Sequence, residues 1–159
     1  MATLENQVID LLNSRGMTLG VVESATGGLI SHTITNVPGC SSYYKGSVTS
    51  YSNESKMNII GVKAATLEKY GSVSPQVAEE MAAGGKKVLN VDVCVADTGI
   101  AGPGGATPGK PVGLFYIGLA YGEVVFSRKY EFHGDRAQNK QSAATAALKW
   151  VKEYLDSPS

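Results

Sequence analysis

Hydrophobic residues recur along the chain in two periods, one typical of helices and the other of strands. Leu4, Val8, Leu11 and Leu12 follow the helical spacing until Gly16, which is suited to end a helix. The same spacing, with capping or terminating residues, predicts further helices over 29–37, 52–60, 64–70, 75–89 and 136–155. Short runs of apolar and β-branched residues predict strands over 17–22, 46–51, 91–96, 113–120 and 123–132.

The order of these elements predicts the fold class. Strands alternate with helices over most of the chain, whereas the last two strands are joined at Tyr121-Gly122 as an antiparallel hairpin. We therefore expect an α/β fold, namely a three-layer α/β/α sandwich with a mixed, mostly parallel sheet and a late antiparallel hairpin. The chain has 159 residues and no repeat or linker, so we expect a single domain over 1–159.

The charge balance argues against two classes of partner. Fourteen Lys and Arg residues balance fourteen Asp and Glu residues, whereas nucleic-acid-binding domains usually carry a basic excess. No apolar run approaches the ~18 residues of a membrane span, and the first residues lack the basic-then-apolar order of a signal peptide. We expect a cytoplasmic protein whose partners include neither nucleic acid nor membrane.

The cysteines and histidines do not predict a metal site. Cys40 and Cys94 are far apart and form no ligand spacing with His32 or His133. We accordingly expect a protein that uses no metal and no organic cofactor.

Glycines gather in two loops that follow predicted strands. Thr26-Gly27-Gly28 would place backbone N–H groups at the start of a helix, which favours an anion. The segment 97–103 ends the next long strand, a usual place for ligand contact in open α/β sheets. Arg136 opens the last helix and could bind a phosphate as a bidentate fork, although Arg136 and Lys56, taken singly, are more readily explained as exposed charges. The residues alone thus indicate a site for a small molecule that contains phosphate.

Five segments carry a resemblance to a known family. They are VESATGG (22–28), PGCSSYYKGSVTSYSNESK (38–56), GIAGPGG (99–105), KPVG (110–113) and FHGDR (132–136). With these segments in this order, the chain resembles the CinA C-terminal domain family, the nicotinamide mononucleotide deamidases. The resemblance implies an α/β/α fold and a serine amidohydrolase with a Ser/Lys pair. Such an enzyme hydrolyses the nicotinamide carboxamide of the mononucleotide and releases nicotinic acid mononucleotide and ammonia.

The resemblance also implies roles for individual residues. It assigns Ser41 as the nucleophile, Lys56 as the base and Tyr51 as the accompanying tyrosine, while the adjacent Ser42 leaves the nucleophile ambiguous by one position. The implied substrate-binding residues are Thr26, Gly27, Gly28, Ser42, Asn53, Thr98, Gly99, Ile100, Ala101, Gly102 and Arg136.

The chemistry of the implied site depends on an uncharged lysine. A serine hydroxyl needs a base within hydrogen-bond reach, and lysine can serve only if desolvation or positive potential lowers its pKa from about 10.4. We expect Tyr51 to bridge the two groups or to protonate the ammonia, and a glycine loop to stabilise the oxyanion. The family and the exposed hairpin edge also predict a homodimer. Two alternatives stay open, namely a binding module without activity and a Ser/Lys amidohydrolase of another small amide.

Overall fold

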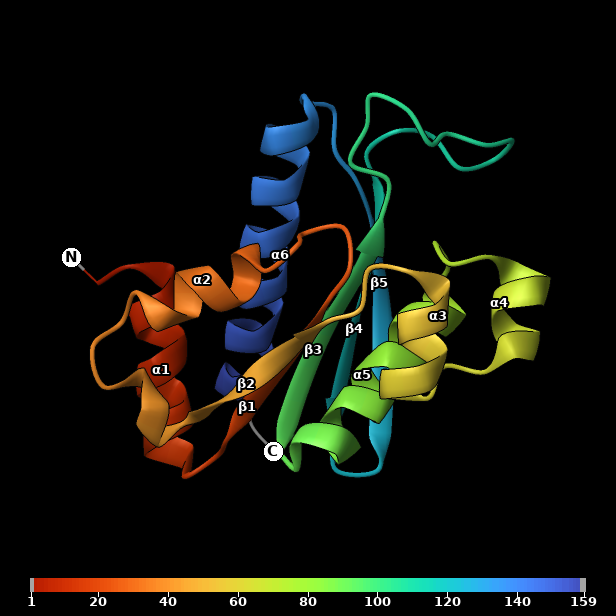
Figure 1. The fold of residues 1–159 in the computed structure, drawn as a ribbon. Coiled ribbons are helices and arrows are strands. Elements are labelled where there is room, and N and C mark those ends of the chain that lie inside the picture. The colour runs from red at the N-terminus through yellow and green to blue at the C-terminus, as the bar shows by residue number, and fades with distance from the viewer. Residues whose placement is uncertain (1, 158–159) are drawn as a thin grey trace.

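The computed structural model describes residues 2–157 of the chain (Figure 1). The strands are β1 (Leu19–Glu23), β2 (Tyr44–Thr49), β3 (Val93–Gly99), β4 (Leu114–Tyr121) and β5 (Val124–Glu131). The helices are α1 (Leu4–Arg15), α2 (Leu29–Thr35), α3 (Asn53–Ser55), α4 (Ala64–Tyr70), α5 (Pro75–Leu89) and α6 (Arg136–Asp156), with short turns η1 (Cys40–Ser42) and η2 (Lys56–Ile60).

The strands form one mixed sheet in the order β2-β1-β3-β4-β5. β1 pairs with both β2 and β3 in parallel, and Val21 lies between Ser47 and Val95 in this register. β4 and β5 add two antiparallel pairings at the other edge, with Tyr121 opposite Val124 beside the hairpin turn. The predicted mixed sheet with a late hairpin is therefore confirmed.

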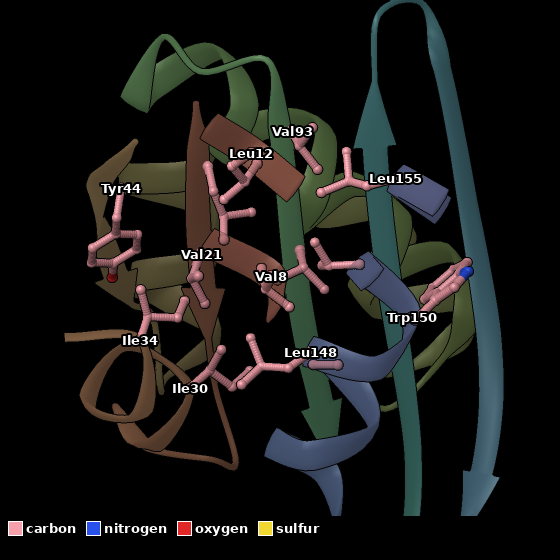
Figure 2. Close-up of a cluster of buried hydrophobic side chains, with 14 of the residues drawn as sticks. Val8, Leu12, Val21, Ile30, Ile34, Tyr44, Val93, Leu148, Trp150 and Leu155 are labelled. Carbon is pink, nitrogen blue, oxygen red and sulfur yellow. The ribbon is translucent and has the colours of Figure 1, made fainter. Parts of the chain in front are cut away.

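Helices cover both faces of the sheet, which completes the three predicted layers. α1, α2 and α6 lie on one face and α5 on the other (Figure 1). On the first face, Val8 and Leu12 of α1 meet Ile30 of α2 and Leu148 of α6 over Val21 of the sheet (Figure 2). All five side chains are buried, and each buried aliphatic side chain contributes about 1.5–3 kcal/mol relative to exposure.

Local sequence signals explain where the long helices begin. Ser74 caps α5 by accepting a hydrogen bond from the Val77 N–H, and Pro75 occupies the first helical position. Asp135 and Gln138 form a reciprocal capping box at the start of α6. Both caps hold these helices at defined positions against the sheet.

Two glycines allow elements to approach more closely than any other residue would permit. A Cβ on Gly118 of β4 would lie 2.1 Å from the Ala78 carbonyl oxygen of α5. A Cβ on Gly84 of α5 would lie 2.1 Å from the Ile60 carbonyl oxygen of η2. α5 therefore packs directly on the sheet and directly against η2.

One predicted helix has a different local structure. The segment expected to be helical over 52–60 begins at the Ser52 cap as α3 and continues from Lys56 to Ile60 as a π-helical turn. π-helical turns are rare in proteins, and many of those that occur lie at functional sites. The second predicted strand is also shifted, since β2 begins at Tyr44, whose side chain is buried in the core, and ends at Thr49.

Candidate functional site

The carboxyl ends of the three parallel strands meet at one edge of the sheet. The segments that follow β1, β2 and β3 lie at this edge, and the loop 100–113 extends beyond it next to the start of α6 (Figure 1). In open α/β sheets, ligands bind at this edge where the strand order reverses, which here is between β1 and β3.

Lys56 brings a buried amine to this edge. Its side chain is only 1% exposed, and Nζ contacts the Ser50 carbonyl oxygen at 3.0 Å, the Tyr51 carbonyl oxygen at 3.0 Å and Ser24 Oγ at 2.9 Å. Burial lowers the pKa of the Lys56 amine, and the nearby Asp97 carboxyl opposes part of that shift. No acidic side chain forms an ion pair with this amine within residues 2–157.

Ser24, and not Ser41, is the serine that lies beside the Lys56 amine. It directly follows β1, is 7% exposed, and turns its hydroxyl toward Lys56. Ser41 and Ser42 lie in η1, before β2, whereas the carbonyls that contact Lys56 belong to residues after β2. The six residues of β2 separate these ends by about 17 Å. The predicted pairing of Lys56 with Ser41 or Ser42 is therefore wrong.

Sequence reasoning missed Ser24 although one local signal was present. Ser24 stands at the junction of a buried strand and a glycine-containing turn, a position from which a side chain is presented at a sheet edge. The resemblance assigned the nucleophile to the doubled serine at 41–42 instead.

A buried acidic cluster supports the turn after β1. Thr26 Oγ1 contacts Glu23 Oε1 at 2.7 Å and Asp97 Oδ1 at 2.5 Å. The Asp97 carboxyl also accepts hydrogen bonds from the Ser24 N–H at 3.0 Å and the Thr26 N–H at 3.2 Å. Burial raises the pKa of Asp97 to about 6, although these hydrogen bonds oppose the shift.

This cluster changes the interpretation of Thr26-Gly27-Gly28. The Thr26 N–H already bonds to Asp97 and the Gly27 N–H to the Ser24 carbonyl. Glu23 accepts the next donors at the helix start, from Ile30 at 2.8 Å and Ser31 at 2.9 Å. Thr26 is buried against the two carboxyls. The predicted anion site at this helix start is therefore wrong, because a side chain of the protein occupies it.

An open cavity of about 270 Å³ is lined by Ala25, which follows Ser24, and by Tyr51, whose carbonyl contacts Lys56. Ser24 and Lys56 lie behind this wall and are not themselves lining residues. Six predicted site residues line the cavity, namely Tyr51, Gly99, Ile100, Ala101, Gly102 and Arg136. Five further lining residues were missed, namely Ala25, Ser72, Val73, Gly104 and Gly105. The site thus includes the turn before α5, which no motif had indicated.

The remaining predicted binding residues lie outside this cavity. Thr98 is buried and donates its hydroxyl hydrogen to the Ser72 carbonyl at 2.7 Å, so it holds a wall residue in place. Asn53 is exposed at the start of α3, and Gly27 and Gly28 are not among the lining residues.

Arg136 connects this cavity to a second one. Its Nη1 donates to the Gly102 carbonyl at 2.7 Å and its Nη2 to the Tyr51 hydroxyl at 3.2 Å. The second cavity, of about 530 Å³, shares Ala101, Gly102 and Arg136 with the first. The two cavities are therefore neighbours that share part of their walls.

Tyr51 does not make the bridge expected of it. Its side chain is 60% exposed, and its hydroxyl contacts Arg136. It reaches Lys56 only through its backbone carbonyl. The bridge that we expected Tyr51 to form between Lys56 and the serine is therefore wrong.

Metal-ligand clusters, membrane-spanning helices and a reactive buried thiol are lacking in the described part of the chain. Within residues 2–157, no three His, Cys, Asp or Glu side chains gather in a way that could hold a metal ion. None of the helices there is both long enough and apolar enough to span a bilayer. Burial raises the pKa of the Cys94 thiol to about 12, which removes its nucleophilic form near neutral pH.

Comparisons with known proteins agree with this architecture. Residues 1–155 match the CinA C-terminal domain family. The chain is 47% identical over 152 residues to a competence-damage inducible protein of Thermoanaerobacter pseudethanolicus and 45% identical over 152 residues to a CinA-like protein of Thermotoga neapolitana. Each alignment covers 96% of this chain and 37% of the relative, so the chain spans little more than a third of their length.

Solved structures give the same result. A CinA superfamily protein from Klebsiella pneumoniae superposes with a TM-score of 0.93 at 28% identity, covering 96% of this chain and 95% of that chain. A competence/damage inducible protein from Agrobacterium tumefaciens superposes with a TM-score of 0.91 at 32% identity, covering 97% and 94%.

Proposed function

Because the chain belongs to the CinA C-terminal domain family, we propose that its Ser24–Lys56 site hydrolyses the carboxamide of nicotinamide mononucleotide. The products would be nicotinic acid mononucleotide and ammonia. One observation carries the proposal, namely a buried lysine amine 2.9 Å from a serine hydroxyl beside an open cavity.

The three oxygen contacts of Lys56 fit an ammonium, and a neutral amine can make them as well if the bond to Ser24 is reversed. A neutral –NH₂ group has two hydrogens and one lone pair. The Ser50 and Tyr51 carbonyls can accept both hydrogens, which leaves the lone pair facing Ser24 Oγ. In this state the Ser24 hydroxyl donates to Lys56, which is the arrangement that general-base catalysis requires.

The proposed reaction has two stages. Ser24 Oγ attacks the carboxamide carbon while its proton moves to Lys56, and Lys56 then gives that proton to the departing nitrogen, which leaves as ammonia. A water molecule, deprotonated by Lys56, next attacks the resulting ester. Lys56 returns this proton to Ser24 Oγ as the ester C–O bond breaks, which releases the carboxylic acid and restores the neutral amine. Both stages pass through an oxyanion, and the Ala25 N–H, which follows Ser24 in a wall of the cavity, is free of acceptors within residues 2–157.

Two features support a phosphorylated and cationic substrate. Arg136 is the charged side chain in the wall of the first cavity, and it can bind a phosphate as a fork. The second cavity continues past Arg136 to the start of α6. A pyridinium carboxamide is more electrophilic than an ordinary amide, and its charge would help to keep Lys56 neutral.

The test is ammonia release from nicotinamide mononucleotide by the purified protein, with nicotinamide and other small carboxamides measured in parallel. We expect release from the mononucleotide and its loss in Lys56→Ala, with Lys45→Ala as a control at an exposed lysine of β2. Saturable binding of the mononucleotide without ammonia from any amide would contradict the proposal and favour a binding module. Release from a different amide alone would retain the Ser/Lys chemistry and replace the substrate.

A further inference from the structure

Asp97 lies behind the Ser24–Lys56 pair and is not among the individually predicted site residues. We propose that Asp97 is a positioning residue, which fixes Ser24 through its carboxyl and, through a proton shared with Glu23 across Thr26, sets how basic Lys56 is. This inference rests on the proposed function, because it concerns the base of that reaction.

The carboxyl of Asp97 fixes the backbone around the nucleophile. Oδ1 accepts the Ser24 N–H at 3.0 Å and Oδ2 accepts the Thr26 N–H at 3.2 Å, so the two bonds bracket Ala25. They orient the Ser24 hydroxyl toward Lys56 and leave the Ala25 N–H toward the cavity. An amide side chain could not replace this carboxyl fully, because its –NH₂ group would face one of the two N–H donors.

Counting hydrogens favours one extra proton in the cluster. The Thr26 hydroxyl has a single hydrogen, yet its oxygen contacts both Glu23 Oε1 and Asp97 Oδ1. Two carboxylates could share that hydrogen only in a three-centre bond, whereas a proton on one carboxyl, donated to Thr26 Oγ1, would give each contact a hydrogen of its own.

The surroundings place that proton on Asp97. Both carboxyls accept two backbone N–H groups, but the contact of Glu23 with Ser31 is only partly buried, whereas both contacts of Asp97 are buried. Asp97 is fully buried, and its cross-strand neighbour on β4 is the apolar Ile117. Burial accordingly raises the pKa of Asp97 to about 6.

Few charges face Asp97 from the surrounding elements. β1 contributes Glu23 and η2 contributes Lys56. α6 brings the Lys140 amine beside Gly27, since a Cβ on that glycine would lie 3.7 Å from Lys140 Nζ. The buried residues of α5 and α6 carry no charge. Among these groups, Asp97 is the one whose charge opposes the lowering of the Lys56 pKa.

The direction of this effect follows from electrostatics. While Asp97 carries the shared proton, it is neutral and does not stabilise the Lys56 ammonium. Once Asp97 loses the proton, its carboxylate stabilises the ammonium and makes Lys56 a less available base. The proton that leaves Asp97 goes to solvent or to Lys56, so charge balances in either case.

The experiment is an NMR titration of the substrate-free full chain, following the Lys56 Nζ and Cε and the Asp97 carboxyl carbon. In the wild type we expect the Asp97 carboxyl to titrate near pH 6. The Lys56 signals should show a second transition over the same pH range, besides the one caused by titration of Lys56 itself. In Asp97→Asn and Asp97→Ser, we expect the pKa of Lys56 to fall by about one unit, because the carboxylate is gone. Asp10→Asn, at an exposed position of α1, should leave it unchanged.

Kinetics provide a second readout on the same variants. We expect a lower kcat with nearly unchanged KM, and an acid limb of kcat/KM displaced downward by about one pH unit. A structural role alone would lower activity without moving that limb. An Asp97 carboxyl that titrates at an ordinary value in the wild type, or a Lys56 pKa unchanged in folded variants, overturns the inference. Since the titration needs no substrate, it separates this failure from that of the proposed function, which is absence of ammonia release by the wild type.

Discussion

The amine of Lys56 lies 2.9 Å from the hydroxyl of Ser24, although 32 positions separate the two residues in the sequence. Parallel pairing of β1 with β2 brings them together, because Glu23 is in register with Thr49 and the chain continues from each into the site. The pair is therefore a product of the sheet register, and each partner depends on the strand that precedes it.

Replacing the two candidate nucleophiles separately discriminates between them. We expect Ser24→Ala to lower ammonia release from nicotinamide mononucleotide by about 10³-fold or more, because the attacking oxygen is gone. Ser41→Ala, at an exposed position before β2, should retain near wild-type kcat. A coupled ammonia assay on both variants gives the answer, and an active Ser24→Ala variant would refute the assigned geometry.

Activity should be lost on the acid side as Lys56 becomes charged. Burial lowers the pKa of Lys56 from 10.5, and only the neutral amine can accept the Ser24 proton. The rate should therefore fall as the pH drops through the pKa of Lys56 and reach a plateau above it. Lys56→Arg should be inactive at every pH because arginine stays charged, and Lys45→Arg serves as the matched control. The pH profile of kcat/KM measures both effects, and a profile without an acid limb would contradict the assignment.

Asp97 should make the folded state less stable as the pH rises. Its pKa is about 6 when folded and 3.8 when exposed, so the neutral carboxyl is favoured in the folded state. This contribution is fully present below pH 3.8 and is lost as the pH rises through 6. Between pH 4 and 8, the free energy of unfolding of the wild type should drop by about 2 kcal/mol relative to Asp97→Asn. Urea unfolding of both proteins across this range measures the difference, and parallel curves would be the contrary result.

Arg136 should matter most when the substrate carries a phosphate. We expect Arg136→Gln to raise KM for nicotinamide mononucleotide about tenfold or more, because a charge-assisted fork is lost. The riboside without phosphate should show a much smaller change in KM between the two proteins. Arg15→Gln, on α1, is the control. Equal effects on both substrates would show that Arg136 acts through its bonds to Tyr51 and Gly102 rather than on phosphate.

A methyl group at position 118 should separate α5 from the sheet. Gly118→Ala would place Cβ 2.1 Å from the Ala78 carbonyl oxygen, so backbone would have to move. We expect a loss of about 1–3 kcal/mol in the free energy of unfolding, typical of overpacking. Gly104→Ala, with no atom within 4 Å of the added Cβ, should be nearly neutral. Urea denaturation of the Gly118→Ala and Gly104→Ala variants measures both losses, and equal stability of the two would contradict the close packing.

Most of the fold was predictable because the strands and the long helices have their own local signals. The capping serine and proline at 74–75 and the Asp135 cap fix α5 and α6, and the apolar run at 93–96 gives a central strand. The π-helical turn at Lys56 has no such signal, because its pattern of apolar residues also fits an ordinary helix.

The site was only partly predictable, since contacts between distant segments decide it. The glycine loop 99–102, Lys56 and Arg136 were identified, whereas Ser24 was not, because its role depends on the pairing of β1 with β2. Glu23 similarly occupies the start of α2 in place of a ligand, which the sequence pattern does not indicate. The homodimer and the cytoplasmic location remain predictions.

The absence of a side chain at Gly84 determines how deep the reactive nitrogen lies. Because the η2 backbone rests directly against this position, even a single added carbon would push the turn outward and admit water to the amine. A hydrated lysine holds its proton at physiological pH. Basicity at one end of the sheet thus depends on the thickness of the helix that packs against the lysine's own turn.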